Sequence, residues 1–251
     1  MNAIAPRAAL ILVFLLAAAL RGLNHAQVFD GGEGVVFPAY DAYYHLVRAF
    51  ETMRNFPWVP LFDPGMNHPY GAPVIWPPLF DFLLAAVGIA AGGPENADSV
   101  ETALAWLIPF MGAATVFAVY WLIVQITGRR AEALAGAALL AATPAHILYS
   151  GVGYVDHHAA VTFLSTLMFA LFLAAYRGSG PSLAGAALAM AAGLLTWNGF
   201  IVYVGILDVW LFCLLAVEGR RAGSRVPALW WTTHVAAALI VAPFAAAQAA
   251  A

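Results

Sequence analysis

Apolar runs long enough to cross a lipid bilayer recur along most of the chain. A spanning helix needs about 20 mostly apolar residues, and seven stretches approach this length: 8–23, 102–126, 131–149, 159–176, 182–197, 199–217 and 228–247. Only 9% of the residues are charged, whereas a soluble domain carries roughly 25%. We therefore predict an all-α integral membrane protein, a polytopic bundle of about seven transmembrane helices.

An eighth apolar run, 74–92, is interrupted by prolines and contains Asp81. The distribution of arginines indicates whether this run crosses the membrane, because short cytoplasmic loops are rich in basic residues. If it does not cross and Arg7 is cytoplasmic, seven arginines lie inside: Arg7, Arg129, Arg130, Arg177, Arg220, Arg221 and Arg225. Three lie outside: Arg21, Arg48 and Arg54. A full crossing would weaken this bias, so we expect 74–92 to be interfacial or re-entrant.

The resulting topology has a long first external loop, 24–101, with amphipathic or re-entrant helices, and a short second external loop, 150–158. The long loop carries nine acidic residues: Asp30, Glu33, Asp41, Glu51, Asp63, Asp81, Glu95, Asp98 and Glu101. Asp156 lies in the short loop. We expect a multi-pass protein of a prokaryotic cell membrane, with 8–23 as a retained span and any chemical site on the non-cytoplasmic face.

The first candidate motif, Asp41-Ala-Tyr-Tyr-His45, lies in the long loop. The residues after it fit an amphipathic helix of about four turns, with Arg48, Glu51 and Arg54 on its polar side. Asp41 would then stand at the helix start, as a site residue or as a carboxylate that caps free backbone N–H groups.

The second candidate motif is Gly153-Tyr-Val-Asp156-His-His158, between two predicted spans. In an extended turn, residues two apart point the same way, so Asp156 and His158 could bind one ion. A carboxylate with an imidazole suits Mn²⁺, and Mg²⁺ less well because it prefers oxygen ligands. The alternative is a polar turn in which Asp156 caps the next helix.

Other polar residues give weaker signals. The segment 67–81 is rich in proline and predicts a rigid loop; Asp63 and His68 are minor site candidates. Asp208 lies within a predicted span, where a carboxylate is either functional or bound to a partner on another helix. Trp197-Asn-Gly199 predicts a tight external turn. The chain has no basic patch interleaved with aromatic residues, so we expect no nucleic-acid partner.

Three segments in this order resemble the catalytic subunits of oligosaccharyltransferase, the membrane enzymes of asparagine-linked glycosylation. They are the Asp41 motif, the stretch Pro69-Tyr-Gly-Ala-Pro with Trp76-Pro-Pro-Leu-Phe-Asp81, and the Asp156 motif. The resemblance implies a metal-dependent membrane glycosyltransferase that moves an oligosaccharide from a polyprenyl pyrophosphate to asparagine in Asn-x-Ser/Thr. Its partners would be that lipid-linked oligosaccharide, an acceptor polypeptide and membrane lipid.

The resemblance also implies roles for individual residues. Asp41 takes the place of an aspartate that binds the metal and engages the acceptor amide, and Asp156 and His158 take the places of paired ligands for Mn²⁺ or Mg²⁺. Asp41 and Asp156 are thus the expected catalytic residues, and Asp41, Asp156 and His158 the expected metal ligands.

The resemblance covers residues 1–251 as an N-terminal transmembrane domain. The family's later spans, a further glutamate and the soluble C-terminal domain with Trp-Trp-Asp-Tyr-Gly are not in this sequence. We therefore expect a truncated transferase, inactive alone, for which a second chain that completes the fold is an open partner. The alternatives are another polyprenyl-phosphate-sugar transferase, or a transporter that uses Asp208. Polar residues concentrated outside the predicted spans argue against transport.

Overall fold

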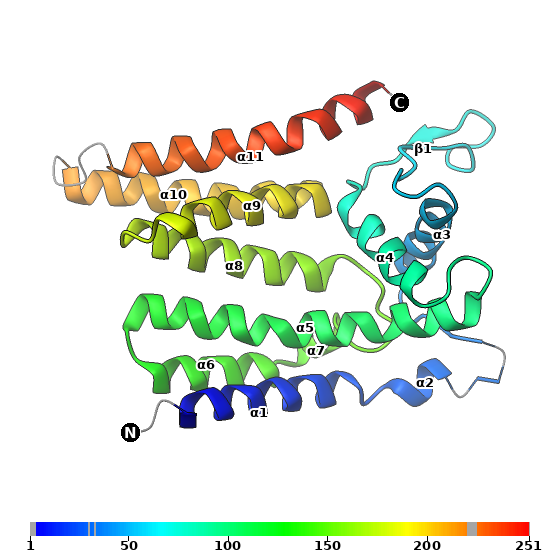
Figure 1. Ribbon diagram of the computed structural model, residues 1–251, viewed down its shortest axis with the longest axis horizontal. Coiled ribbons are helices and arrows are strands. Elements are labelled where there is room, and N and C mark those ends of the chain that lie inside the picture. The colour runs from blue at the N-terminus through cyan, green and yellow to red at the C-terminus, as the bar shows by residue number, and fades with distance from the viewer. Residues whose placement is uncertain (1–3, 30, 33, 220–224, 251) are drawn as a thin grey trace.

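The computed structural model describes residues 4–29, 31–32, 34–219 and 225–250. Its long helices lie side by side along one direction (Figure 1). They are α1 (Ile4–Arg21), α5 (Ala97–Thr127), α6 (Arg130–Ala141), α8 (His158–Tyr176), α9 (Gly180–Thr196), α10 (Ile201–Glu218) and α11 (Arg225–Ala250). Four residues that contribute to the predicted charge distribution lie outside the described residues: Asp30, Glu33, Arg220 and Arg221.

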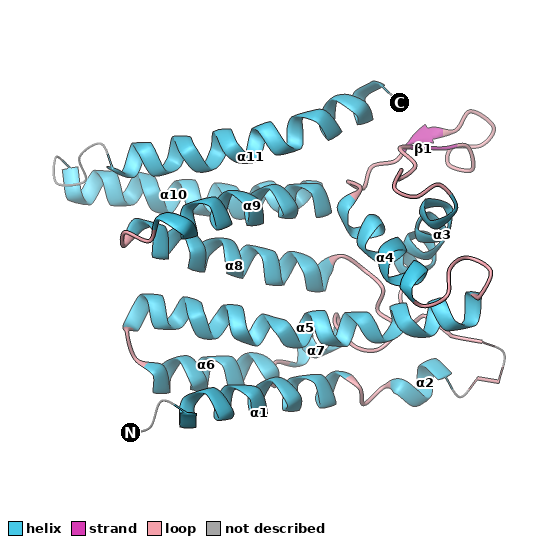
Figure 2. Cartoon of the chain, viewed as in Figure 1, coloured by secondary structure: helices cyan, strands magenta, loops and turns pink. Residues whose placement is uncertain are grey.

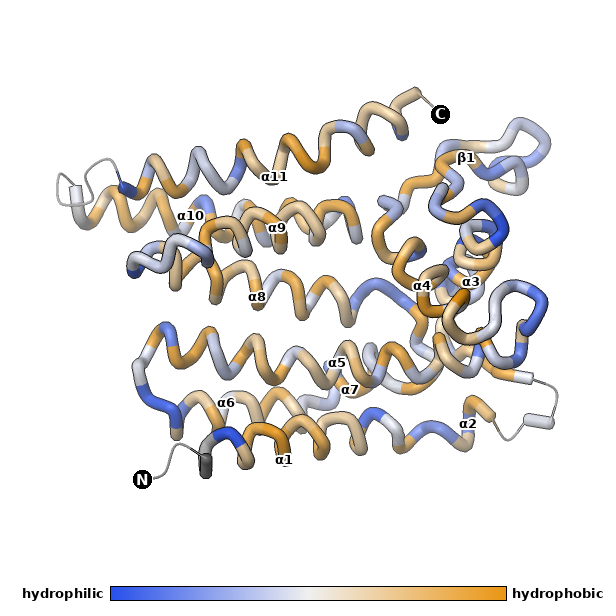
Figure 3. Tube along the Cα trace, viewed as in Figure 1, coloured by the Kyte–Doolittle hydropathy of each residue, from blue (hydrophilic) through white to orange (hydrophobic). Residues whose placement is uncertain are grey.

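Within the described residues, four helical segments are long and apolar enough to cross a bilayer: Ala97–Thr127, His158–Tyr176, Asn198–Val217 and Arg225–Ala250. A membrane protein built of helices is therefore confirmed. The other three predicted spans also contain helices, α1, α6 and α9, but the count of seven crossings remains a prediction. Hydrophobic residues predominate along the long helices, as expected for elements in contact with lipid (Figure 3).

The predicted span 131–149 is not one continuous helix. Helix α6 ends at Ala141, and after two intervening residues a short helix α7 (Pro144–Leu148) begins. Proline disfavours helical backbone in the residue before it and supplies no N–H to the ladder. Pro144 therefore ends the first helix near Thr143 and starts the second.

The predicted long loop folds into a cap at one end of the bundle (Figure 2). The cap consists of α2 (His25–Phe29), α3 (Tyr40–Arg54), the strands β1 (Phe62–Asp63) and β2 (Ala72–Pro73), and α4 (Leu79–Ala90). The two strands pair antiparallel, with Phe62 opposite Pro73. Helix α4 has 12 residues, about 18 Å at 1.5 Å per residue, which is too short to cross a core of about 30 Å. This agrees with the prediction that 74–92 does not span.

The cap is fixed to the bundle by a shared apolar core. Leu84 of α4 is completely buried with Leu104 and Ile108 of α5. Burial of each such side chain stabilises the fold by about 2 kcal/mol. The far end of α11 also contacts the cap, because the Gln248 side-chain amide donates to the Val74 carbonyl at 2.5 Å. These contacts hold the cap against α5 and the C-terminal end of α11.

A buried arginine ties the end of α1 to the second loop. Arg21 is fully buried and donates from Nε to Ser150 Oγ at 2.8 Å and from Nη2 to His146 Nδ1 at 2.6 Å. Both Arg21 and Ser150 had been assigned to the non-cytoplasmic side, and the structure brings them together at the capped end. This end also holds the candidate site.

Candidate functional site

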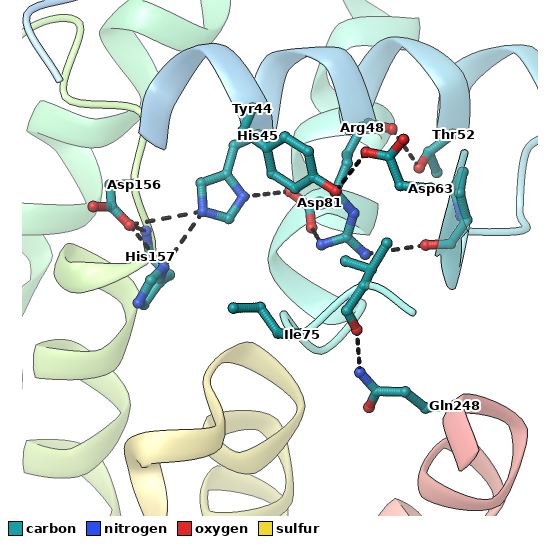
Figure 4. A network of polar contacts seen from close by, with 12 residues as sticks. Tyr44, His45, Arg48, Thr52, Asp63, Ile75, Asp81, Asp156, His157 and Gln248 are labelled. Carbon is teal, nitrogen blue, oxygen red and sulfur yellow. Dashed lines mark hydrogen bonds and ion pairs between the residues drawn. The ribbon is translucent and has the colours of Figure 1, made fainter. Parts of the chain in front are cut away.

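Helix α3 of the cap and the turn before α8 meet through two histidines (Figure 4). His45 Nε2 lies 3.4 Å from His157 Nδ1, and the ring centroids are 5.6 Å apart. Asp156 lies beside both rings. His45 is 1% exposed, His157 4% and Asp156 5%, so the meeting point is closed to bulk water.

The turn before α8 owes its shape to local backbone geometry. Gly153 has a φ of +77°, a region that other residues rarely adopt. A Cβ there would also lie 3.0 Å from Pro38 Cδ and 3.2 Å from Val28. Glycine therefore allows the turn to approach the cap closely, and this approach delivers Asp156 and His157 to α3.

On the other side, His45 is held by a buried carboxylate. His45 Nδ1 lies 2.6 Å from Asp81 Oδ1, and Arg48, one turn further along α3, forms an ion pair with Asp81 Oδ2. A carboxylate oxygen accepts, so His45 Nδ1 is the donor in this contact. The Nε2 atom of His45 is then directed at Asp156 and His157.

Asp156 uses its two oxygens on opposite sides. Oδ1 accepts from the His157 backbone N–H at 2.6 Å and contacts His157 Nδ1 at 2.7 Å, and His45 Nε2 lies 3.7 Å away. Oδ2 lies 3.3 Å from His158 Nε2. Burial by itself raises the pKa of Asp156, but the hydrogen bond to His157 and the charges of the neighbouring imidazoles outweigh it and hold this pKa below its usual value.

The structure brings together two of the three predicted ligands. Asp156 and His158 approach as the sequence suggested, with His158 about half exposed. Asp41 lies in the first turn of α3 and is exposed. It is four residues before His45, hence one helical turn from the junction. Among the described residues, the group whose ligand atoms all lie within 4.8 Å of one another is instead His45, Asp156 and His157.

Three sequence-based expectations are corrected here. Asp41 is not the N-cap of its helix, because Ala39 holds that position and no side chain caps it. Asp156 does not cap α8 either; it bonds to the backbone of His157, which is the N-cap. Arg48 does not lie on a solvated polar face but is 1% exposed, since Asp81 neutralises it inside the cap.

Sequence reasoning missed His45, Asp81, His157 and Trp197 as site residues. His45 and Arg48 are three apart, so they share a helix face, and this spacing with Asp81 nearby was the available signal. Trp197, predicted only as part of a turn, stacks on His157 with centroids 5.7 Å apart and planes 27° apart. Nothing in the local sequence indicates that contact.

The weaker candidates have other partners. Asp63 accepts from the Tyr44 hydroxyl at 2.9 Å, and burial together with this carboxylate raises the pKa of Tyr44 above its usual value. His68 lies in an exposed turn of the cap. Asp208 of α10 accepts from Trp230 Nε1 of α11 at 2.7 Å and contacts His234 at 3.2 Å. A structural role linking α10 to α11 accounts for Asp208.

The sequence is similar to known oligosaccharyltransferase proteins. Residues 11–251 match the family model described as "Oligosaccharyl transferase STT3, N-terminal". The chain is 32% identical over 219 residues to dolichyl-phosphooligosaccharide-protein glycotransferase 1 of Archaeoglobus fulgidus, an alignment that covers 87% of this chain and 35% of the relative.

The fold also matches solved structures of an Archaeoglobus fulgidus oligosaccharyltransferase. One, tethered to an acceptor peptide containing the NVT sequon, has a TM-score of 0.88 at 24% identity over 96% of this chain and 30% of its own. Another, a complex with Zn and sulfate, has a TM-score of 0.84 at 23% identity over 94% of this chain and 31% of its own. The chain thus spans about a third of the length of these proteins.

Proposed function

Because the chain belongs to the family of the N-terminal region of the oligosaccharyl transferase STT3, we propose that it supplies the two-loop site of an oligosaccharide transfer reaction. The donor is a polyprenyl-pyrophosphate-linked oligosaccharide, and the acceptor is asparagine in Asn-x-Ser/Thr of a polypeptide. The relative named above is a dolichyl-phosphooligosaccharide-protein glycotransferase. The observation that carries the proposal is the meeting of α3 with the Asp156 turn at the capped end of a membrane bundle.

We propose that Asp41, Asp156 and His158 hold a divalent cation on the outer side of the junction. Asp156 Oδ2 and His158 Nε2 are 3.3 Å apart, a separation compatible with two ligands of one ion. Two carboxylates with one imidazole suit Mn²⁺, with Mg²⁺ the alternative. When bound, the ion would neutralise negative charge that develops on the departing pyrophosphate.

The residues of this chain then have distinct tasks. An amide nitrogen is a weak nucleophile, and the exposed Asp41 carboxylate can accept a hydrogen bond from it and orient it. The buried junction behind Asp156 fixes this carboxylate against rotation, because both of its oxygens have partners. A preorganised charge of this kind acts without the reorganisation that water would require.

Two cavities offer room for substrate. One of about 430 Å³ lies beside the site, lined by His158, Tyr149 and Ser150 among others. A second, of about 460 Å³, is apolar and lies between α5, α8 and α10, with Arg177 at its edge. We propose that the cavity beside the site receives groups next to the reacting centre and that the apolar one accommodates hydrocarbon of a lipid.

The proposal is tested in a chimaera in which residues 11–251 replace the matching region of the Archaeoglobus fulgidus glycotransferase. Purified chimaera is given lipid-linked oligosaccharide and a fluorescent peptide with Asn-x-Thr, with Gln-x-Thr as the control acceptor. We expect glycosylation of the Asn peptide alone, lowered at least about 100-fold by Asp156→Asn. Equal transfer by the parent and variant chimaeras would exclude the assigned role.

The same assay distinguishes the proposed peptide glycosylation from the alternative transferase function. A chimaera that glycosylates a lipid or glycan acceptor but not the peptide would indicate another polyprenyl-phosphate-sugar-dependent enzyme. The transport alternative loses its main support, because Asp208 has hydrogen-bond partners on α11. We retain the proposed localisation in a prokaryotic cell membrane, with the site on the non-cytoplasmic face.

A further inference from the structure

We propose that His45, Asp156 and His157 form a second, inner cation site that favours Zn²⁺ or a similar late transition metal. This site uses neither Asp41 nor His158. It shares Asp156 with the outer site through the other oxygen, since Oδ1 faces the two histidines and Oδ2 faces His158. The inference concerns ion binding and does not depend on transfer activity.

The spacing of the three ligand atoms is the first argument. The separations are 2.7 Å from Asp156 Oδ1 to His157 Nδ1, 3.4 Å between the two imidazoles and 3.7 Å from Oδ1 to His45 Nε2. A tetrahedral ion with ligands at about 2.1 Å holds neighbouring ligand atoms about 3.4 Å apart. The three measured separations bracket this value, so the triad accepts an ion with small side-chain movements.

An incomplete contact at the same place is the second argument. His45 uses Nδ1 for its contact with Asp81, which leaves its Nε2 directed at Asp156 Oδ1. At 3.7 Å the two atoms are too far apart for a hydrogen bond, and both residues are almost fully buried. An imidazole nitrogen and a carboxylate oxygen are both common metal ligands, so a cation placed between these two buried atoms would contact both.

The hydrogen-bond partner of His45 is arranged as it commonly is around metal-bound histidines. A ligating imidazole usually donates its other N–H to a carboxylate, which fixes the ring and raises its basicity. Asp81 does this for His45 at 2.6 Å. His157 would have to move its proton from Nδ1 to Nε2, and Nε2 is a buried atom to which no described residue bonds. That shift leaves the total number of protons unchanged.

The donor set selects the class of ion. Two imidazole nitrogens and one carboxylate oxygen suit Zn²⁺, whereas Mg²⁺ prefers all-oxygen coordination. The half-exposed His158 lies at the opposite oxygen of Asp156 and provides a route of entry. Because His45 and His157 are 112 residues apart in sequence, a bound ion would fasten α3 to the turn before α8.

The test measures binding of Co²⁺, whose visible absorption reports its coordination. Binding of Zn²⁺ is then measured by its competition with Co²⁺. The purified 251-residue chain in detergent is compared with His45→Gln, His157→Gln, His158→Gln and the exposed control His25→Gln. We expect affinity at least about tenfold weaker for His45→Gln and His157→Gln, and within about threefold of wild type for His25→Gln. Zn²⁺ should also raise the Tm of wild type but not of His45→Gln or His157→Gln.

X-ray absorption spectroscopy of the wild-type chain loaded with one equivalent of Zn²⁺ gives a second test. It does not depend on whether a variant folds. Two imidazoles in the coordination shell are expected from the inner triad, and one from the outer site with His158 alone. Absence of Co²⁺ uptake, a single imidazole, or loss of binding only in His158→Gln would overturn the inner site. Failure of the chimaera to transfer oligosaccharide would leave these ion-binding results unchanged. The two proposals are therefore tested independently.

Discussion

At the scale of single residues, the site depends on charges that have been removed from water. Asp81 is fully buried and is shared by Arg48 and His45. A buried charge with its partners intact costs little, but loss of one partner leaves an uncompensated charge in a low dielectric. The orientation of His45, and through it the setting of Asp156, therefore depends on residues that touch no substrate.

Replacement of Arg48 by Met tests this dependence. The methionine fills a similar volume but leaves Asp81 without its cation, so we expect a loss of about 3 kcal/mol in the free energy of unfolding. Arg54→Met is the matched control, because Arg54 lies on the same helix and is exposed; its effect should stay within about 0.5 kcal/mol. Denaturation of both variants in one detergent gives the comparison, and equal losses would show that the ion pair does not stabilise the cap.

At the scale of helices, packing depends on how closely two backbones can approach each other. Gly112 lies in α5 where the helix passes the Arg21–Ser150 contact. A Cβ at this position would lie 2.4 Å from Ser150 Cβ and 2.9 Å from Arg21 Nε. Small residues let membrane helices approach in this way, and here the approach joins α1, α5 and the second loop.

Gly112→Ala should therefore destabilise the protein by about 1–3 kcal/mol through overpacking. Gly205→Ala in α10 is the control, because a Cβ there meets nothing within 4 Å. Its higher helix propensity should stabilise the chain slightly, by up to about 1 kcal/mol. Thermal unfolding of the two variants should shift in opposite directions, and a neutral Gly112→Ala would mean that α5 does not press on the loop.

The helices themselves were largely predictable from sequence, and their interruptions were less so. Each predicted span coincides with helix because a lipid-exposed backbone has to satisfy its hydrogen bonds internally. The break before Pro144 was missed because the hydropathy of 131–149 is continuous across it. The internal structure of the cap was also missed: its polar pairs join Arg48 to Asp81 and His45 to His157, and such long-range pairing leaves no local periodicity.

At the scale of the whole molecule, a membrane bundle carries a polar cap in which two distant loops converge. The sequence predicted the loops, the Asp156–His158 approach and the family resemblance, and the match over residues 11–251 confirms that resemblance. It did not predict that His45 and His157 would form the buried contact between the loops. That contact exists because the apolar core of α4 and α5 holds the cap in place, and burial of this kind is a property of the folded chain.

We propose that Asp41 and Asp156, from different loops, bind one divalent cation. Electron paramagnetic resonance of Mn²⁺ titrated into the purified chain tests it most directly, with wild type, Asp41→Asn and Asp156→Asn measured in the same detergent. We expect wild type to bind Mn²⁺ and each variant to bind it at least about tenfold more weakly. Wild-type affinity in Asp41→Asn, or no binding by wild type, would contradict the claim that the two loops share an ion.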